Sequence, residues 1–277
     1  MIFKKNIGFS AAAVTNMGKV RTNNEDNLYF DGDILSAETV SSMSDKNIEF
    51  SRENAGDGLF CVCDGMGGES YGELASLIAV TSMQEMKEEF SSAQKGKLKE
   101  VVGKYVELAN TKICEQITKL GVNRIGTTYV LAKFIGTTAY ISNIGDSRAY
   151  LIRKNSIRQL NRDHTEMAYY VAAGLLTEEE ARKHPRRHGI TQHLGIFPDD
   201  MELSPYFAEV IEARPDDVFI LCSDGLTDML DDSEILSCVR SCRKKGAAAV
   251  SSELVAKALK AGGNDNVTVI SIIASRV

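Results

Sequence analysis

Residues 59–70, LFCVCDGMGGES, decide the fold of this chain. The residues before Asp64 are apolar strand formers, too few for a helix, and the run stops abruptly at that acid. Gly65, Gly67 and Gly68 follow, and glycine lets a backbone turn sharply and approach a ligand closely. An acid at the end of a buried strand suits a hard cation bound by oxygen. A lone Asp-Gly pair is more often an ordinary turn, so the interpretation depends on similar acids elsewhere.

Length and composition are those of an ordinary globular chain. It has 277 residues, of which 43% are hydrophobic and 25% charged, enough for a sizeable core. The net charge of −6 argues against a general nucleic-acid binder. No run approaches 18 apolar residues, so we expect no membrane partner. The N-terminus resembles a signal peptide, but its apolar stretch, 7–14, is short and contains a glycine, which favours a first strand.

The six cysteines are expected to be free thiols. None forms a CxxC motif, and four lie in apolar strand or helix patterns, as buried thiols in a reducing compartment do. Cys238 and Cys242 are four residues apart on a predicted helix and could form half of a metal site. No matching Cys or His pair lies nearby, which favours core packing. We therefore expect a cytoplasmic protein.

The hydrophobic pattern predicts an α+β fold. Short or alternating apolar runs predict strands at 9–16, 28–30, 59–64, 127–134, 138–143, 147–153, 156–160, 203–210, 218–222 and 267–273. Helical spacing predicts helices at 69–90, 98–121, 233–242 and 247–259. The polar segment 31–57 is predicted to be a hairpin tip or mobile insertion. This order is most simply two packed sheets with helices outside, and 1–277 is predicted to be a single domain.

Acidic residues recur where the predicted strands begin or end. They are Glu25, Asp26, Asp64, Asp146, Asp224, Asp228 and Asp265. If the carboxylates converge, two unit charges about 4 Å apart repel by roughly 4 kcal/mol at an effective dielectric near 20. Repulsion of that size needs cations to offset it. A ligand set without His or Cys favours Mg²⁺ or Mn²⁺ over Zn²⁺.

Such a site suits phosphoryl chemistry. Two ions about 3.5–4 Å apart would activate a water and clamp the oxygens of an in-line displacement at phosphorus. Arg21, four residues before Glu25, could hold a phosphate with both arms of its guanidinium. Taken alone, Arg21 would be better interpreted as an ordinary surface arginine.

The residues resemble the metal-dependent type 2C protein serine/threonine phosphatases, in a bacterial form. The resemblance runs almost end to end and in the family's order, through 21–26 (RTNNED), 64–68 (DGMGG), 72–76 (GELAS), 126–128 (GTT), 143–148 (NIGDSR), 162–165 (RDHT), 223–228 (SDGLTD) and 263–267 (GNDNV). It implies a four-layer α-β-β-α sandwich, with two central antiparallel sheets flanked by helices. A binuclear metal centre is implied at one end of the sheets.

The resemblance also implies roles for single residues. Asp64 corresponds to a catalytic, bridging metal ligand, and Gly65 contributes its carbonyl. Asp224 and Asp265 correspond to ligands of the first ion. Glu25 and Asp26 correspond to partners of metal-bound waters, and Arg21 corresponds to a catalytic phosphate clamp. Asp146 and Asp228 correspond to a third, weaker metal site.

The implied activity is hydrolysis of phosphoserine and phosphothreonine in proteins by a water or hydroxide that two Mn²⁺ or Mg²⁺ ions activate. The expected partners are phosphorylated substrates of a serine/threonine kinase, and the protein is expected to be a monomer. An alternative is a catalytically silent, metal-bound regulator that recognises phosphoproteins, although the complete set of acids speaks against it. A calcium module is a third, but no loop with EF-hand spacing is present.

Two regions depart from the family or vary within it. Many eukaryotic members have a histidine, regarded as a general acid, where this chain has Met66, whose thioether donates no proton. Either a metal-bound water protonates the leaving group, or it departs with less assistance. The segment 162–198 corresponds to the family's variable flap, whose HPRRH stretch, 184–188, could attract acidic phosphopeptides or be a solvated turn. For His164 we favour a structural hydrogen bond over catalysis.

Overall fold

The computed structural model describes residues 7–42, 46–53, 55–67 and 71–277. Gly68 of the glycine-rich motif lies outside the described residues. So do the first two positions of the helix predicted at 69–90 and the charged start of the chain, 1–6.

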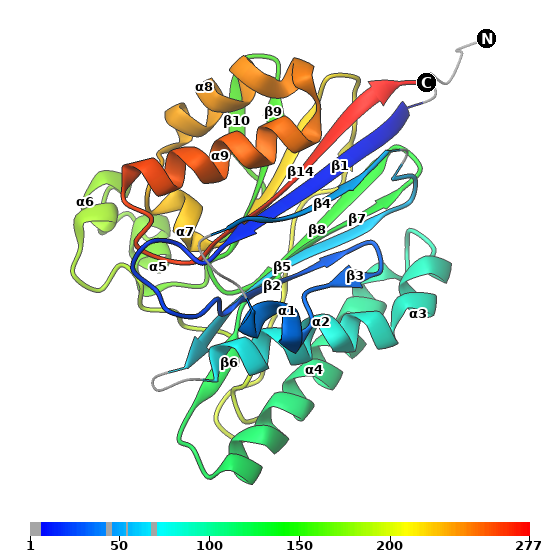
Figure 1. The fold of residues 1–277 in the computed structure, drawn as a ribbon. Coiled ribbons are helices and arrows are strands. Elements are labelled where there is room, and N and C mark those ends of the chain that lie inside the picture. The colour runs from blue at the N-terminus through cyan, green and yellow to red at the C-terminus, as the bar shows by residue number, and fades with distance from the viewer. Residues whose placement is uncertain (1–6, 43–45, 54, 68–70) are drawn as a thin grey trace.

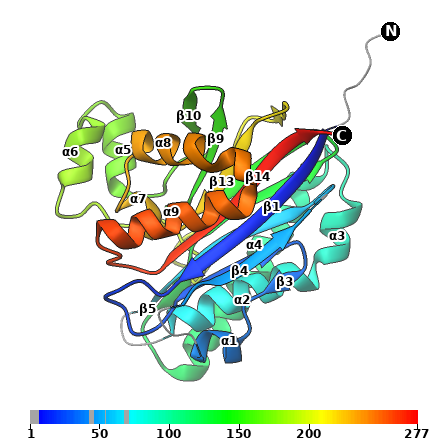
Figure 2. The ribbon, with the colours of Figure 1, turned by 45° about the horizontal axis from the view of Figure 1, so that its top comes forward.

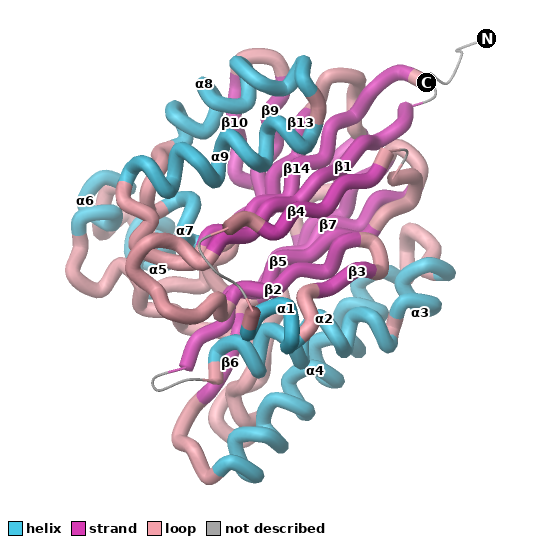
Figure 3. The backbone as a smooth tube through the Cα atoms, in the orientation of Figure 1, coloured by secondary structure: helices cyan, strands magenta, loops and turns pink. Residues whose placement is uncertain are grey.

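Two antiparallel sheets lie face to face at the centre of the molecule (Figure 1, Figure 3). One has the strand order β10 (Ser156–Gln159), β9 (Arg148–Arg153), β13 (Val218–Cys222), β14 (Val267–Arg276), β1 (Ile7–Asn16) and β4 (Ile48–Arg52). The other has the order β11 (Tyr206–Phe207), β8 (Thr138–Ile144), β7 (Tyr129–Ile135), β5 (Leu59–Gly67), β2 (Asp26–Phe30) and β3 (Asp33–Ile34). The short strands β6 (Ile125–Thr127) and β12 (Ile211–Glu212) pair with β5 and β8.

Helices cover the outer face of each sheet, which confirms the predicted four-layer sandwich. Over the second sheet lie α2 (Gly72–Glu85), α3 (Lys87–Ser92) and α4 (Leu98–Leu120) (Figure 1), whereas Val40 of the short helix α1 (Ala37–Ser41) packs into the core between the sheets. Over the first sheet lie α7 (Asp224–Thr227), α8 (Asp232–Cys242), a 3₁₀ turn (Arg243–Lys245) and α9 (Ala247–Ala261). The flap carries α5 (Glu166–Ala172) and α6 (Glu178–Lys183), which lie beside α7 and α8 (Figure 2).

The side-chain alternation of β5 explains why its apolar run is continuous. Phe60 and Val62 face the core between the sheets, whereas Cys61 and Cys63 face the core under α2 and α4. Successive side chains of a strand point to opposite faces. Asp64 therefore falls on the inner face, between the two sheets, at the point where the apolar run ends.

The apolar core between the sheets is rich in aromatic rings. Phe134 packs against Phe9 and Phe219, with ring centroids 4.5 Å and 5.3 Å apart. Phe30 and Phe60, opposite each other on β2 and β5, lie 5.2 Å apart edge to face. All six cysteines are buried free thiols, as predicted.

The structure corrects three predicted elements. The segment 31–57 contains β3, α1 and the edge strand β4, because Ile48 and Phe50 pack against the inner core while their neighbours face outward. The helix predicted at 69–90 is two helices, because Met86 has a non-helical backbone. The strand predicted at 203–210 is reduced to β11, and β12 follows it. Within the described ranges, none of the helices has the length and apolar character needed to span a bilayer.

Candidate metal centre

The antiparallel pairing of the strands brings the predicted acids to one end of the sandwich. Asp26 opens β2 directly opposite Asp64 on β5. In the other sheet, β13 ends two residues before Asp224, and its antiparallel partner β14 begins two residues after Asp265. Asp146 lies in the turn between β8 and β9. In an antiparallel pair, the end of one strand and the start of its neighbour lie at the same end of the sheet. The carboxylates of both sheets therefore meet at one end of the sandwich.

Asp26 links the two sheets. It is buried, and its Oδ2 accepts hydrogen bonds from Ser223 Oγ at 2.7 Å and Thr268 Oγ1 at 2.6 Å, both from the other sheet. Burial raises the pKa of Asp26 to about 7, and the two hydroxyl donors oppose that rise. The sequence analysis assigned no role to either hydroxyl, although Ser223 belongs to the SDGLTD motif.

Asp64 and Asp224 form the centre of the acidic cluster. Burial, followed by the charge of Asp224, raises the pKa of Asp64 well above its usual value. Burial and the charges of Asp228 and Asp265 raise the pKa of Asp224 to about 6, while a hydrogen bond with Asp64 lowers it. Mutual repulsion of this kind is relieved by protons or by cations. The arrangement therefore fits hard cations that oxygen ligands hold.

Glycine is required where β5 passes the start of α2. The Gly65 N–H donates to the Glu25 carbonyl at 3.1 Å, and a Cβ on Gly65 would lie only 2.2 Å from the Gly72 carbonyl oxygen. A Cβ on Gly72 would lie 2.6 Å from Glu25 Oε1. Burial, with the charge of Glu73, raises the pKa of Glu25. The motif glycines thus allow the Glu25 carboxylate to lie against bare backbone.

Asn266 holds the loop that carries Glu25. Its Oδ1 accepts from the Glu25 N–H at 2.8 Å, and its Nδ2 donates to the carbonyls of Met17 and Asn23, both at 2.8 Å. The sequence analysis quoted this residue in the GNDNV motif but gave it no role. Only the folded chain reveals it, because the contacts join segments more than 240 residues apart.

The turn around Asp146 is held by polar contacts and contains an unpaired oxygen. His164 Nδ1 accepts from the Gly145 N–H at 3.2 Å, which agrees with the hydrogen-bonding role predicted for that histidine. Burial lowers the pKa of His164, which favours the neutral ring that can accept. Asp146 Oδ1 is buried and has no hydrogen-bond partner among the described residues. An unpaired buried carboxylate oxygen fits a cation site.

Arg21 lies at the exposed rim of the centre. Its guanidinium donates to Asp265 Oδ2 at 2.7 Å, and its side chain is 49% exposed. The bond to Asp265 raises the pKa of Arg21. The guanidinium is therefore beside the acids, as expected, but it is paired with a predicted metal ligand, which the sequence analysis did not anticipate.

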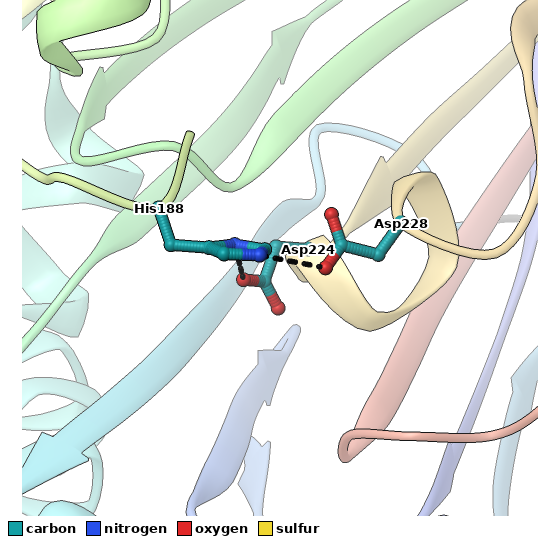
Figure 4. Close-up of side chains that lie close together, drawn as sticks. All are labelled: His188, Asp224 and Asp228. Carbon is teal, nitrogen blue, oxygen red and sulfur yellow. Dashed lines mark ion pairs between the residues drawn. The ribbon is translucent and has the colours of Figure 1, made fainter. Parts of the chain in front are cut away.

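His188 of the flap also reaches the acidic cluster, which sequence reasoning missed (Figure 4). Its Nε2 lies 3.6 Å from Asp228 Oδ2, and its Nδ1 lies 4.0 Å from Asp224 Oδ2. The HPRRH motif was considered for its charge alone, and its spacing carries no signal for this contact.

Comparisons with known proteins agree with this geometry. Residues 37–261 match the family model described as Protein phosphatase 2C. The chain is 34% identical to protein phosphatase PhpP of Streptococcus pneumoniae, over 92% of this chain and 94% of that protein. It is 32% identical to serine/threonine protein phosphatase PstP of Mycobacterium tuberculosis, over 94% of this chain but only 44% of PstP.

The fold has the same relatives. A solved structure of the PstP catalytic domain in complex with two manganese ions superposes with a TM-score of 0.75 at 29% identity, covering 97% of this chain and 99% of that one.

Proposed function

We propose how this chain, which belongs to the protein phosphatase 2C family of metal-dependent serine/threonine protein phosphatases, holds its ions and its substrate. Enzymes of this family use two Mn²⁺ or Mg²⁺ ions. The observation that carries the assignment is the meeting of buried and partly buried, mutually repelling carboxylates from both sheets around Asp64. When bound, the ions supply an activated water for attack on phosphorus.

The proposed ligand roles are those that the family resemblance implies for the acids of this cluster. Asp64 would serve as a ligand for both ions, together with the Gly65 carbonyl next to it in the chain. Asp224 and Asp265 hold one ion from the other sheet. Glu25 and Asp26 orient waters around the ions; the hydroxyl donors on Asp26 support a fixed orientation for that carboxylate.

Two further assignments concern the edge of the site. Asp146 and Asp228 are proposed to hold a third ion, which the unpaired buried oxygen of Asp146 supports. Arg21 is proposed to clamp the phosphate of the substrate. Its guanidinium is exposed to solvent and lies beside Asp265, so a phosphate at the acidic cluster could contact it.

The substrates of the enzyme are phosphorylated proteins. We further propose that they are the targets of a serine/threonine kinase and that 1–277 acts as one catalytic domain, as a monomer, in the cytoplasm. Shared sheets support the single domain, since strands from both halves of the chain build each sheet. Buried free thiols support a reducing compartment.

The test is hydrolysis of a phosphothreonine peptide with and without chelator. EDTA treatment followed by dialysis should abolish activity, and Mn²⁺ should restore it. Full activity in a demonstrably metal-free sample would refute metal-assisted attack. A protein that binds its ions and the peptide but does not hydrolyse it would instead be a silent phosphoprotein-binding regulator.

Two variants test the ligand assignment. Asp64→Asn should abolish the binding of both tight ions in calorimetry and lower turnover by more than about 10²-fold. Residues that only hydrogen-bond to metal ligands typically account for roughly 10–100-fold. Asp146→Ala should keep the two tight ions and reduce turnover through the third. The opposite result, with tight ions lost only in Asp146→Ala, would invert the assignment.

A further inference from the structure

His188 comes from the flap, whereas Asp224 opens α7 and Asp228 caps its C-terminal end. The two segments are more than 30 residues apart in the sequence, and Figure 4 shows the imidazole between the carboxylates of Asp224 and Asp228. The side chain of His188 is 46% exposed, while those of Asp224 and Asp228 are 24% and 31% exposed. The flap thus places a nitrogen donor at the mouth of the acidic cluster.

The two nitrogens of His188 face different carboxylates, each at a distance too long for a direct hydrogen bond. The distances of 3.6 Å and 4.0 Å exceed the roughly 2.7–3.2 Å of a hydrogen bond. One ligand atom from each of the three residues lies within 4.8 Å of the other two. Ligands that bind one ion at about 2.1 Å lie about 3–4 Å from each other. One imidazole nitrogen and one oxygen of each carboxylate therefore lie near the spacing that ligands of a shared cation have.

A second feature involves Asp146, whose charge interacts with that of Asp224. The buried Oδ1 of Asp146 has no hydrogen-bond partner in the part of the chain that the structure describes. Among the neighbouring charges that raise the pKa of Asp146, Asp224 comes first. A cation beside Asp224 would satisfy an oxygen that otherwise carries the cost of a buried, unpaired acceptor.

We propose that His188 supplies a nitrogen ligand to the same third cation that Asp146 and Asp228 are proposed to hold, beside Asp224, and so ties the flap to the catalytic centre. The inference rests on the proposed function, because Asp224 is shared with the ions of the reaction. An imidazole ligand shifts the preference of a site from Mg²⁺ toward Zn²⁺ or Ni²⁺. The third site is therefore selective for a borderline cation, and its occupancy holds the flap in place.

The first experiment measures Zn²⁺ binding to the enzyme in saturating Mg²⁺. The wild type should bind one equivalent of Zn²⁺ in equilibrium dialysis, and His188→Asn should weaken that equivalent by at least about 10–100-fold, since even outer-shell changes have effects of this size. His184→Asn is the matched control, because it removes a partly exposed imidazole from the same flap segment, one whose Nδ1 accepts from the Arg186 N–H and is not part of the cluster. It should bind Zn²⁺ as the wild type does.

The second experiment measures the flap itself by limited trypsin digestion. Cleavage after Arg186 and Arg187 should slow when Zn²⁺ is added to the Mg²⁺-loaded wild type and to His184→Asn. In His188→Asn, Zn²⁺ should give no such protection. This readout is independent of turnover.

The outcomes separate the two levels of inference. Equal Zn²⁺ affinity in the wild type and His188→Asn would overturn the ligand role and leave a histidine that merely faces two acids. Equal weakening in both histidine variants would overturn it too, because it would indicate a general charge effect. Failure of the proposed function is distinct: the wild type would then bind no Mn²⁺ or Mg²⁺ and hydrolyse no phosphopeptide.

Discussion

Replacing Asp26 with asparagine should stabilise the metal-free protein at neutral pH but much less in mild acid. Burial raises the pKa of Asp26 from 3.8 to about 7. The folded state therefore binds a proton that the unfolded state releases, and stability falls as pH rises through the window between these values. Asparagine keeps an oxygen to accept from Ser223 and Thr268 but never ionises.

The size of the effect follows from the two pKa values. One pKa unit corresponds to about 1.4 kcal/mol, so the full penalty of ionising Asp26 is roughly 4 kcal/mol above the folded-state pKa. At about pH 5 roughly 1.5–2 kcal/mol of that penalty is already present. The advantage of Asp26→Asn over the wild type should thus grow by roughly 2–3 kcal/mol between about pH 5 and pH 8.

The assay is urea unfolding of both proteins in EDTA at a series of pH values. The quantity to follow is the difference in the free energy of unfolding between the two proteins. Burial lowers the pKa values of His164 and His193, so both residues destabilise the folded state as pH falls, against the trend that Asp26 produces, and they do so in both proteins. Saturating Mn²⁺ should reverse the order of stability, since the wild type keeps its full set of ionised acids for the ions. A difference that stays constant with pH would refute the reasoning.

Three further predictions concern single contacts. Arg21→Ala should raise KM for small phosphate esters by about tenfold or more, and Arg21→Lys should restore part of the lost affinity. Metal affinity should change little, because the exposed ion pair between Arg21 and Asp265 is weak. Unchanged kinetics would make Arg21 an ordinary surface charge. Gly65→Ala should lower Tm and metal affinity together, because its Cβ would lie 2.2 Å from a carbonyl oxygen; a wild-type Tm would contradict the clash. Arg153→Met should cost about 3 kcal/mol in urea unfolding, since it leaves the carboxylate of Asp217, which is 2% exposed, with the Arg214 N–H but without a positive partner. Removing both charges should recover most of that cost.

The sequence was sufficient for those features that depend on short-range periodicity. Alternation along β5 predicts that Asp64 follows Phe60 and Val62 onto the buried face, and the structure places those two in the inner core. The strand pattern showed that acids recur at strand ends, but only the family resemblance implied that they meet; the structure brings Asp26 opposite Asp64 through the pairing of β2 with β5. The prediction from periodicity failed at β4. This edge strand is partly buried at every second residue, so in sequence it resembles a polar loop.

Contacts that join distant segments could not be predicted. Thr268 and Ser223 reach Asp26 across the interface between the sheets, and no spacing in the sequence encodes that distance. His188 meets Asp224 because of how the flap folds back, which depends on the packing of α5 and α6 beside α7 (Figure 2). Tertiary packing, rather than local propensity, decides such contacts.

The placement of the acids explains how the fold tolerates them. Phe60 lies four residues before Asp64 on β5, and Phe30 lies four residues after Asp26 on β2, so about 13 Å of strand separates the aromatic core from the carboxylates. Between these points the interface of the two sheets changes from apolar contacts to the polar ones that Asp26 makes. Repulsion among the acids therefore acts at one end of the sandwich, while the ring contacts that hold the sheets together lie behind it. Removing the ions should loosen that end without unfolding the rest, so metal binding can control activity in a chain that stays folded.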